Sequence, residues 1–499
     1  MNTSLAPGFV ALHGNRSETL LAAVAHWLAQ HPLAPLEAET ILTQSNGMAE
    51  WVKMSLAQTH GICAAVSVQL PGRFQWRIYR QVLGREAVPA RAPLDKTAAT
   101  WRLMRLLAQL PDAPDFAPLA AWLGREDALR AFALARRIAD LFDQYQVHRP
   151  DWLEDWARGE DVLHNGRDKA QPLPENQHWQ PALWRMLVAT LGEERSSAIR
   201  PQLHARVLDV LRNTPPEEAR ARFGLPRRVV LFGMTHIPRP ILELLAALSR
   251  HVQVLLAIPN PCRFYWADIL DGREWLHHIQ RRRHTLRAGV ELCDVPLEAM
   301  HLHAPPLLAA WGRQSRDCIR QLDEFDDVER TRARFADARI DLFDETPAAP
   351  TQPLLTQVQA YIRDLVPLAE QAHIAPAPED CSIVFHVAHS AVRELEILHD
   401  QLLHLLAAPP PEGCAPLAPR DIVVMVPAID TFAPAIRAVF GRYAPSDARH
   451  IPFAIADLSA RMAAPLVGAV QWLLELPQAR APLSDLRHFL EYPAVAARF

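Results

Sequence analysis

The sequence predicts an α/β protein built on parallel sheets, and three observations support this fold class. Short apolar runs alternate with segments of helical periodicity between residues 8 and 95. Two more apolar runs, at 227–234 and 252–258, follow a long helical stretch. The alternation then starts again after residue 381. Strands that alternate with helices form parallel sheets covered on both faces, so we expect two α/β domains, the first carrying a helical insertion.

The first part of the chain has the pattern of three strand–helix units. Ser45 or Asn46 is expected to cap the second helix, and Pro71 stands near the start of the third. The expected strands are 8–12, 39–44 and 62–70, and the helices that follow them are 20–30, 45–60 and 71–83.

Residues 95–215 are mostly helical, and proline-rich stretches at 344–353 and 371–381 mark a domain boundary. Beyond that boundary, strands at 382–388, 421–427 and 451–456 are expected to alternate with helices. The chain then stops without a tail, which favours an incomplete second domain. The predicted organisation is a first α/β domain, a helical insertion, the remainder of the first domain, a linker and a second α/β domain, at 1–95, 96–220, 221–345, 346–380 and 381–499.

Composition limits the classes of function. The 499 residues carry a net charge of −4, so the chain does not coat nucleic acid through bulk charge, although a local basic channel is compatible with this balance. The six cysteines are scattered without a C-x-x-C motif, which is typical of reduced thiols. No secretory signal and no apolar run of membrane-spanning length is recognisable. We therefore expect a cytoplasmic protein.

The motifs of an ATPase are missing from the expected positions. A P-loop needs G-x-x-x-x-G-K-[ST], yet "HGNRSET" after the first strand has Gly14 without a later Gly-Lys pair. Glu18 near the end of this loop would repel phosphate, and "VVLFGMTH" has no acidic residue to hold Mg²⁺. The histidines at 277, 278, 284, 301 and 303 form no metal-ligand pattern, and no G-x-S-x-G elbow occurs. We predict no active centre and no cofactor in this chain.

Several stretches resemble the RecC family, the gamma chain of exodeoxyribonuclease V. The resemblance runs from Gly8 to Phe499, and family members are more than twice as long, so the chain is similar to their N-terminal part. It is carried by "ILTQSNGMAEWVKMSLAQTHGI", "LPGRFQW", "ADLFDQY", "HRPDWL", "LFGMTHIPRP", "NPCRFYWADI", "LLAAWGRQSRD" and "FHVAHSAVRELEILHDQLL".

The resemblance implies a superfamily-1 helicase fold whose ATPase motifs are degenerate. It also implies RecB-like and RecD-like motor and nuclease partners, which hold the ATP and Mg²⁺, and a role in recombinational repair of DNA double-strand breaks. In such a complex the gamma chain splits the duplex, guides the strands and scans the 3′ strand for the Chi sequence. Two alternatives stay open: a pure scaffold that clamps the partners with little DNA reading, and an independent ATPase.

The stretch "ADLFDQYQVHRPDWLEDW" at 139–156 gathers five carboxylates around two tryptophans. Three interpretations apply: a solvated helix face with an Arg136–Asp140 pair, a catalytic carboxylate pair, or a surface that reads DNA bases. Helical spacing puts Phe132, Ala135, Ile138, Phe142 and Tyr145 on one apolar face. The resemblance implies that this stretch lines the tunnel of the scanned strand and that Chi recognition involves Asp140, Leu141, Asp143, Gln144 and Arg149. Carboxylates, amides and guanidinium groups can read base edges.

"QLPGRFQWRIYRQV" interleaves aromatic residues with arginines, a composition that can stack bases and hold phosphates. Phe74, Ile78 and Val82 form the expected buried row, so Trp76 is the better DNA candidate and Leu70 accompanies it. In active helicases of the resembled fold, the loops corresponding to 43–47 and 70–76 touch single-stranded DNA. The resemblance also matches Arg200 to a recognition position.

Overall fold

The computed structural model describes residues 6–124, 128–164, 170–192, 196–267, 305–325, 339–343, 352–371, 376–410, 413, 415–458, 464–476 and 480–498. The chain divides into two units, Met1–Pro378 and Glu379–Phe499, and each is described by itself.

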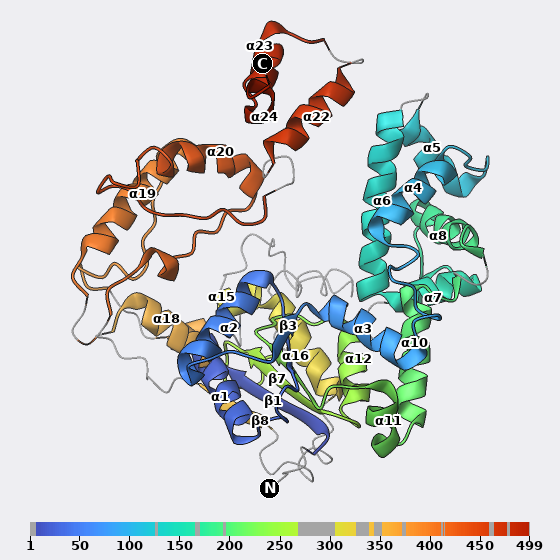
Figure 1. Ribbon diagram of the computed structural model, residues 1–499, viewed down its shortest axis with the longest axis horizontal. Coiled ribbons are helices and arrows are strands. Elements are labelled where there is room, and N and C mark those ends of the chain that lie inside the picture. The colour runs from blue at the N-terminus through green and yellow to red at the C-terminus, as the bar shows by residue number, and fades with distance from the viewer. Residues whose placement is uncertain are drawn as a thin grey trace, which may run out of the picture. The chain divides into compact units, whose positions relative to one another are not determined.

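The first unit is built on a six-stranded parallel sheet with the order β3-β2-β6-β7-β1-β8 (Figure 1). The expected strands are confirmed in this unit, although the third is shorter than the apolar run that predicts it. The strands are β1 (Gly8–Gly14), β2 (Glu39–Thr43), β3 (Val66–Gln69), β6 (Arg228–Phe232), β7 (Gln253–Pro259) and β8 (Arg339–Leu342).

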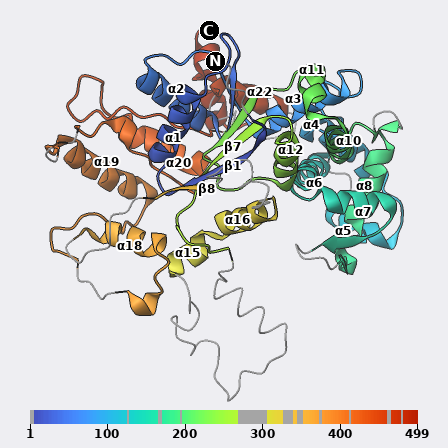
Figure 2. The ribbon, with the colours of Figure 1, turned by 90° about the horizontal axis from the view of Figure 1, so that it is seen from below.

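Helices cover both faces of this sheet, and successive strand residues alternate between two cores. Val230, Phe232 and Leu255 face α1 (Ser17–Gln30) and α2 (Asn46–His60). Their neighbours Val229, Leu231 and Val254 face the opposite core, which includes α3 (Pro71–Leu83), α10 (Arg200–Asn213), α11 (Pro216–Phe223), α12 (Arg239–Leu248) and α16 (Arg313–Phe325). Figure 2 shows α1 and α2 on one side of β1 and β7 and α12 on the other.

Local signals explain where several helices begin. Ser45 caps α2 as expected, its hydroxyl accepting a hydrogen bond from the Met48 amide at 3.2 Å. Pro71 stands at the first position of α3, where its missing amide proton costs nothing.

The helical insertion has a core of its own between Leu94 and Ile199. Phe142, Trp156 and Trp184 are buried in it, and the small antiparallel hairpin β4 (Val162–His164) and β5 (Ala170–Pro172) lies beside α7. Its helices are α4 (Lys96–Leu107), η1 (Pro114–Phe116), α5 (Ala117–Leu123), α6 (Ala128–His148), α7 (Pro150–Arg158), η2 (Glu175–Gln177) and α8 (Trp179–Ala189).

After the sheet, α15 (Pro306–Trp311) packs against α16, and α18 (Leu354–Arg363) and η4 (Leu368–Glu370) complete the described part of the first unit.

The apolar face predicted for α6 is confirmed, because Ala135, Ile138 and Phe142 are buried.

The second unit corrects the sequence prediction. None of the expected strands, 382–388, 421–427 and 451–456, belongs to a sheet among its described residues. Their apolar side chains are largely exposed, with Phe385 at 89%, Val387 at 95% and Met425 at 88%. Apolar alternation favours a strand only where a neighbouring strand pairs with the backbone. The described helices of this unit are α19 (Ala391–Ala407), η5 (Pro419–Asp421), α20 (Ile429–Phe440), α22 (Pro465–Glu475), α23 (Leu483–Leu490) and α24 (Pro493–Ala496).

Candidate nucleic-acid interface

A cavity of about 890 Å³ lies where three neighbouring parallel strands end. The chain leaves β2 through Gln44, β3 through Leu70 and β6 through Met234, and all three residues line the cavity. The remaining wall comes from α3, from the segment 90–95, from the end of α6 and from the starts of α10 and α12. Ligands of open α/β folds bind at the carboxyl ends of the strands, so this position is the expected one for a binding site.

Leu70, which immediately precedes α3, and Trp76 in its second turn both line this cavity. Phe74, Ile78 and Val82 are buried as predicted, which anchors the helix on the sheet. Trp76 is half-buried, and its indole nitrogen donates a hydrogen bond to the carbonyl of Pro89 at 3.1 Å. Its orientation is therefore fixed, and the two residues that the sequence predicts together do share one site.

Arg200 and Asp143 are far apart in the sequence but form an ion pair. Arg200, the first residue of α10, lines the cavity, and its Nη1 donates to Asp143 Oδ1 of α6 at 2.9 Å. Both side chains are about three-quarters buried, with 28% and 29% exposed, so solvent screens this pair less than a surface pair. The structure thus brings two predicted recognition residues into direct contact at the edge of the cavity.

Asp140, Leu141 and Gln144 do not line the cavity. The Asp140 carboxylate pairs with Lys96 of α4, whereas the sequence had predicted Arg136 of its own helix as the partner. Since α4 packs alongside α6, Lys96 reaches the carboxylate from the neighbouring helix. The hydrogen bond from Lys96 holds the pKa of Asp140 below its usual value, and the nearby positive charges of α6 add to this effect. Gln144 donates to Asp140 at 3.4 Å.

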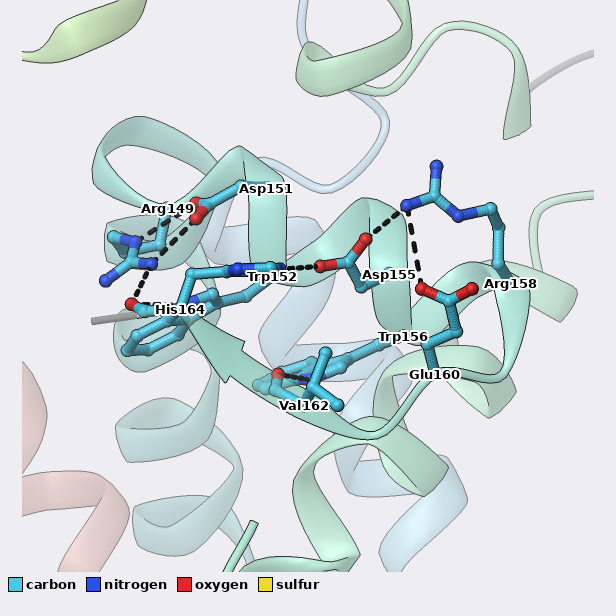
Figure 3. Close-up of polar contacts among 9 residues, drawn as sticks. All are labelled: Arg149, Asp151, Trp152, Asp155, Trp156, Arg158, Glu160, Val162 and His164. Carbon is cyan, nitrogen blue, oxygen red and sulfur yellow. Dashed lines mark hydrogen bonds and ion pairs between the residues drawn. The ribbon is translucent and has the colours of Figure 1, made fainter. Parts of the chain in front are cut away.

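Arg149 is engaged elsewhere, as Figure 3 shows. It separates α6 from α7, as Pro150 predicts, but its backbone is not fully extended (φ −137°, ψ 54°). Its guanidinium binds both oxygens of Asp151, at 3.0 and 2.7 Å, and donates to the carbonyl of His164. It also lies over the ring of Trp152, 3.9 Å from the centroid. Arg149 does not line the cavity, so its predicted contact with DNA stays a prediction.

The carboxylates of α7 hold the β4 strand in place. Asp155, only 8% exposed, accepts from His164 at 2.6 Å and pairs with Arg158 (Figure 3). Trp156 donates from its indole nitrogen to the carbonyl of Val162 at 3.0 Å. Asp151 and Asp155 therefore have structural partners in this network.

The sequence analysis missed a buried polar chain that joins α3, α10 and α12. Gln75 donates to the Tyr79 hydroxyl, which lies 2.7 Å from Nδ1 of His204, and Nε2 of His204 lies 3.0 Å from Glu243. A tyrosine that receives the Gln75 proton donates its own to Nδ1, so His204 Nε2–H donates to the Glu243 carboxylate. Burial acts to raise the pKa of Glu243, but hydrogen bonds from His204 and Arg239 outweigh it and the pKa is lowered. This chain fixes the first turns of α10, and with them Arg200.

Replacing Tyr79 with phenylalanine is expected to lower the free energy of unfolding by about 1–3 kcal/mol, because His204 Nδ1 loses its partner in a buried site. Urea unfolding of the whole chain measures this. Tyr361→Phe is the matched control in the same unit, since its hydroxyl bonds to none of the described residues. Equal urea midpoints for Tyr79→Phe and Tyr361→Phe would contradict the role of this hydrogen bond.

The cavity carries more positive than negative side chains. Arg73 and Arg91 are exposed in its wall, His148 and His236 also line it, and Asp95 is the one carboxylate among the lining residues that the structure describes. Burial lowers the pKa of His148 below its usual value of 6.5, the nearby His236 lowers it further, and Asp143 opposes both. His148 is therefore neutral at pH 7 and becomes a cation only on acidification.

The turn after β1 departs from that of P-loop NTPases. Only Asn15 and Arg16 connect Gly14 to the start of α1 at Ser17, and Glu18 lies in the first turn of that helix. This connection is shorter than a phosphate-binding loop.

The described residues contain no group of three or more potential metal ligands. The histidines considered above, at 277, 278, 284, 301 and 303, lie outside them. Within the same described part of the chain, no helix is both long and apolar enough to cross a bilayer.

The sheet and its cavity define an α/β protein with a cavity at the carboxyl edge of parallel strands, lined by arginine, histidine and aromatic side chains. A family model described as "RecC, N-terminal domain" matches residues 9–365. The chain therefore belongs to the RecC family, in agreement with the resemblance noted in its sequence.

Curated relatives agree with this assignment. The chain is 36% identical to the RecBCD enzyme subunit RecC of Escherichia coli (strain K12), over 98% of the chain and 43% of the relative. It is 33% identical to RecC of Haemophilus influenzae, over 94% of the chain and 42% of the relative. It is 31% identical to RecC of Mycolicibacterium smegmatis, over 98% of the chain and 41% of the relative. The chain thus spans less than half the length of these relatives.

Proposed function

We propose that this chain is a non-catalytic, DNA-guiding part of a RecBCD-type helicase–nuclease and that its cavity receives one unpaired DNA strand. The observation that carries the proposal is the meeting of Leu70, Trp76 and Arg200 in one cavity at the carboxyl edge of the sheet. The family assignment supports the complex, because the relatives are named as subunits of the RecBCD enzyme. RecB-like and RecD-like partners would bind the ATP and Mg²⁺.

The size and charge of the cavity fit unpaired nucleotides. Its volume of about 890 Å³ is within the roughly 300–1,000 Å³ of ligand-binding pockets, which suits a few nucleotides rather than a length of duplex. Arg73 and Arg91 offer guanidinium groups to phosphates, and the half-buried Trp76 offers an aromatic ring in the same wall.

Scanning for a sequence such as Chi requires groups that bind base edges but do not bind every phosphate tightly. The ion pair between Asp143 and Arg200 meets this requirement, because Asp143 neutralises the arginine until a group that binds the guanidinium more strongly displaces the carboxylate. Guanine is such a partner, since it offers two acceptors to a guanidinium. We assign Asp140, Leu141, Gln144 and Arg149 to the surroundings of this reader, with Asp140 and Arg149 acting through their ion pairs.

The test is reconstitution with RecB-like and RecD-like subunits of the same genome, followed by binding to a blunt DNA end with an unpaired 3′ strand. Trp76→Ala is expected to weaken binding about fivefold to a hundredfold, the range for loss of one stacked base. Arg73→Ala, at an exposed position, is a second variant that leaves the core intact.

The controls for this test are Trp311→Ala and Arg220→Ala, which remove exposed side chains on α15 and α11. Both controls should bind like the unmodified chain. Stable assembly with unchanged DNA affinity for Trp76→Ala and Arg73→Ala would instead support a pure scaffold and overturn the proposal.

The pKa of His148 predicts the pH dependence of binding. Because this pKa lies below 6.5, acidification from pH 7.5 to 5.5 increases the charged fraction of His148. Single-stranded DNA should therefore bind up to about fivefold tighter, a charged hydrogen bond being worth roughly 1 kcal/mol more than a neutral one. The His148→Gln variant should lose most of this gain in oligonucleotide affinity.

Without DNA, the same protonation should destabilise the fold below pH 6.5, since the folded state binds this proton less readily than the unfolded chain. Thermal unfolding at the two pH values, with and without oligonucleotide, separates the two effects. A pH response of His148→Gln identical to that of the unmodified chain would contradict the role of this ring.

A further inference from the structure

An aromatic and basic surface on the helical insertion is left unused by the cavity. It consists of Trp101 and Arg105 on α4 and Phe132 and Arg136 on α6, and we refer to it as the α4–α6 surface. Trp101 is 59% exposed, and its ring lies 5.5 Å from that of Phe132 at an angle of 43°. The two helices lie side by side (Figure 1). None of these four residues lines the cavity.

The two helices run antiparallel, which sets the order of side chains along this surface. Lys96 at the start of α4 meets Asp140, and Trp101 meets Phe132, which comes earlier in α6. Arg105 and Arg136 each follow their aromatic neighbour by four residues, one helical turn along. In an antiparallel pair these turns lead in opposite directions, so the two arginines flank the ring pair.

All charged residues of the two helix segments are basic. Helix α4 contains three basic residues and no acidic one, and residues 128–139 of α6 contain three arginines and no acidic residue. Arg102 is occupied, since it donates to the carbonyl and hydroxyl of Thr190 at 3.2 and 3.3 Å. Arg105 and Arg136 form no ion pair with any residue that the structure describes.

We propose that the α4–α6 surface is a second binding site for single-stranded nucleic acid, outside the cavity. Trp101 and Phe132 stack bases, and Arg105 and Arg136 bind the flanking phosphates. The surface carries two guanidinium groups and no carboxylate among its four residues, which favours nucleic acid over a protein partner. This inference rests on the proposed function of the cavity and extends it.

The surface lies close to the cavity along the axis of α4. Asp95 lines the cavity and is the residue that precedes α4. Trp101 lies six residues further on, about 9 Å along the helix axis at 1.5 Å per residue. A strand that leaves the cavity beside Asp95 reaches the ring pair within a few nucleotides.

Oligonucleotide length tests the proposal with the whole chain. Oligothymidines of 6 and 20 nucleotides are titrated by fluorescence anisotropy, the short one filling the cavity and the long one also reaching the α4–α6 surface. Trp101→Ala is expected to lower the affinity for the 20-mer at least fivefold and to leave the affinity for the 6-mer unchanged. Arg105→Ala and Arg136→Ala should each reduce the salt slope of 20-mer binding by about 0.7, the value for one phosphate of a single strand.

Exposed side chains on other elements serve as controls, with Trp311→Ala for the tryptophan and Arg220→Ala for the arginines. Equal affinity of the unmodified chain for the two oligonucleotides, with Trp101→Ala unchanged, overturns this inference and leaves the cavity site intact. No binding of either oligonucleotide overturns the cavity site and this inference together. If Trp101→Ala binds both normally but no longer co-purifies with the RecB-like and RecD-like subunits, the surface is a protein interface and the proposal is wrong.

Discussion

Replacing Glu39 with alanine is expected to lower the free energy of unfolding by about 3–5 kcal/mol, the cost of leaving a buried charge without its partner. Arg228 at the start of β6 is completely buried, and its guanidinium donates to both carboxylate oxygens of Glu39, at 2.7 and 3.2 Å. It also donates to the carbonyl of His31 at 2.6 Å. Without Glu39 the guanidinium keeps only that carbonyl, inside the sheet that carries the cavity.

The adjacent pair provides a matched control. Glu37 lies two residues before Glu39 and Arg227 one residue before Arg228; their side chains are separated by 3.6 Å and are partly exposed. Glu37→Ala should therefore lower the free energy of unfolding by less than about 1 kcal/mol. Urea unfolding of the two variants measures the difference, and equal losses would show that Arg228 does not depend on Glu39.

Removing the Asp143 carboxylate is expected to abolish the response to Chi in the assembled enzyme while unwinding continues. The carboxylate is 2.9 Å from the Arg200 guanidinium and holds it at the cavity edge. In Asp143→Ala the arginine is released to any phosphate, so single-stranded DNA should bind as tightly or more tightly, but with its sequence preference lost. Unwinding assays on DNA with and without Chi measure both properties.

The charge exchange Asp143→Arg combined with Arg200→Asp tests whether the pair itself matters. Two residues in direct contact are expected to show a coupling energy of about 0.5–3 kcal/mol in a double-mutant cycle of folding stability. Glu218→Ala, which removes an exposed carboxylate on α11, is the control for charge. A normal Chi response in Asp143→Ala would remove Asp143 from the recognition site.

Much of the first unit could be predicted from the sequence because its signals are local. Continuous apolar runs such as 227–234 indicated buried parallel strands, and Ser45 and Pro71 marked helix starts. Leu70 and Trp76 followed from one short motif, since both belong to the loop and helix after β3.

The contacts between distant segments could not be predicted in this way. The pairing of Asp143 with Arg200 and the chain from Tyr79 to Glu243 depend on how α3, α6, α10 and α12 pack. The contacts of Arg149 are only partly local: Asp151 and Trp152 follow it closely in the sequence, but the carbonyl of His164 in β4 is not revealed by the side-chain pattern. In the second unit, the apolar runs predict strands, but the described residues provide no neighbouring strand to pair with them.

Photo-crosslinking from the cavity tests the central claim most directly. p-Benzoylphenylalanine replaces Leu70 in the whole chain, which is irradiated with a labelled single-stranded oligonucleotide, and the same residue at Met54, an exposed position on α2, is the control. The account predicts crosslinks from position 70 that unlabelled single-stranded DNA suppresses, with none above background from position 54. Equal crosslinking from both positions, or none from position 70, would contradict the claim that the cavity receives a DNA strand.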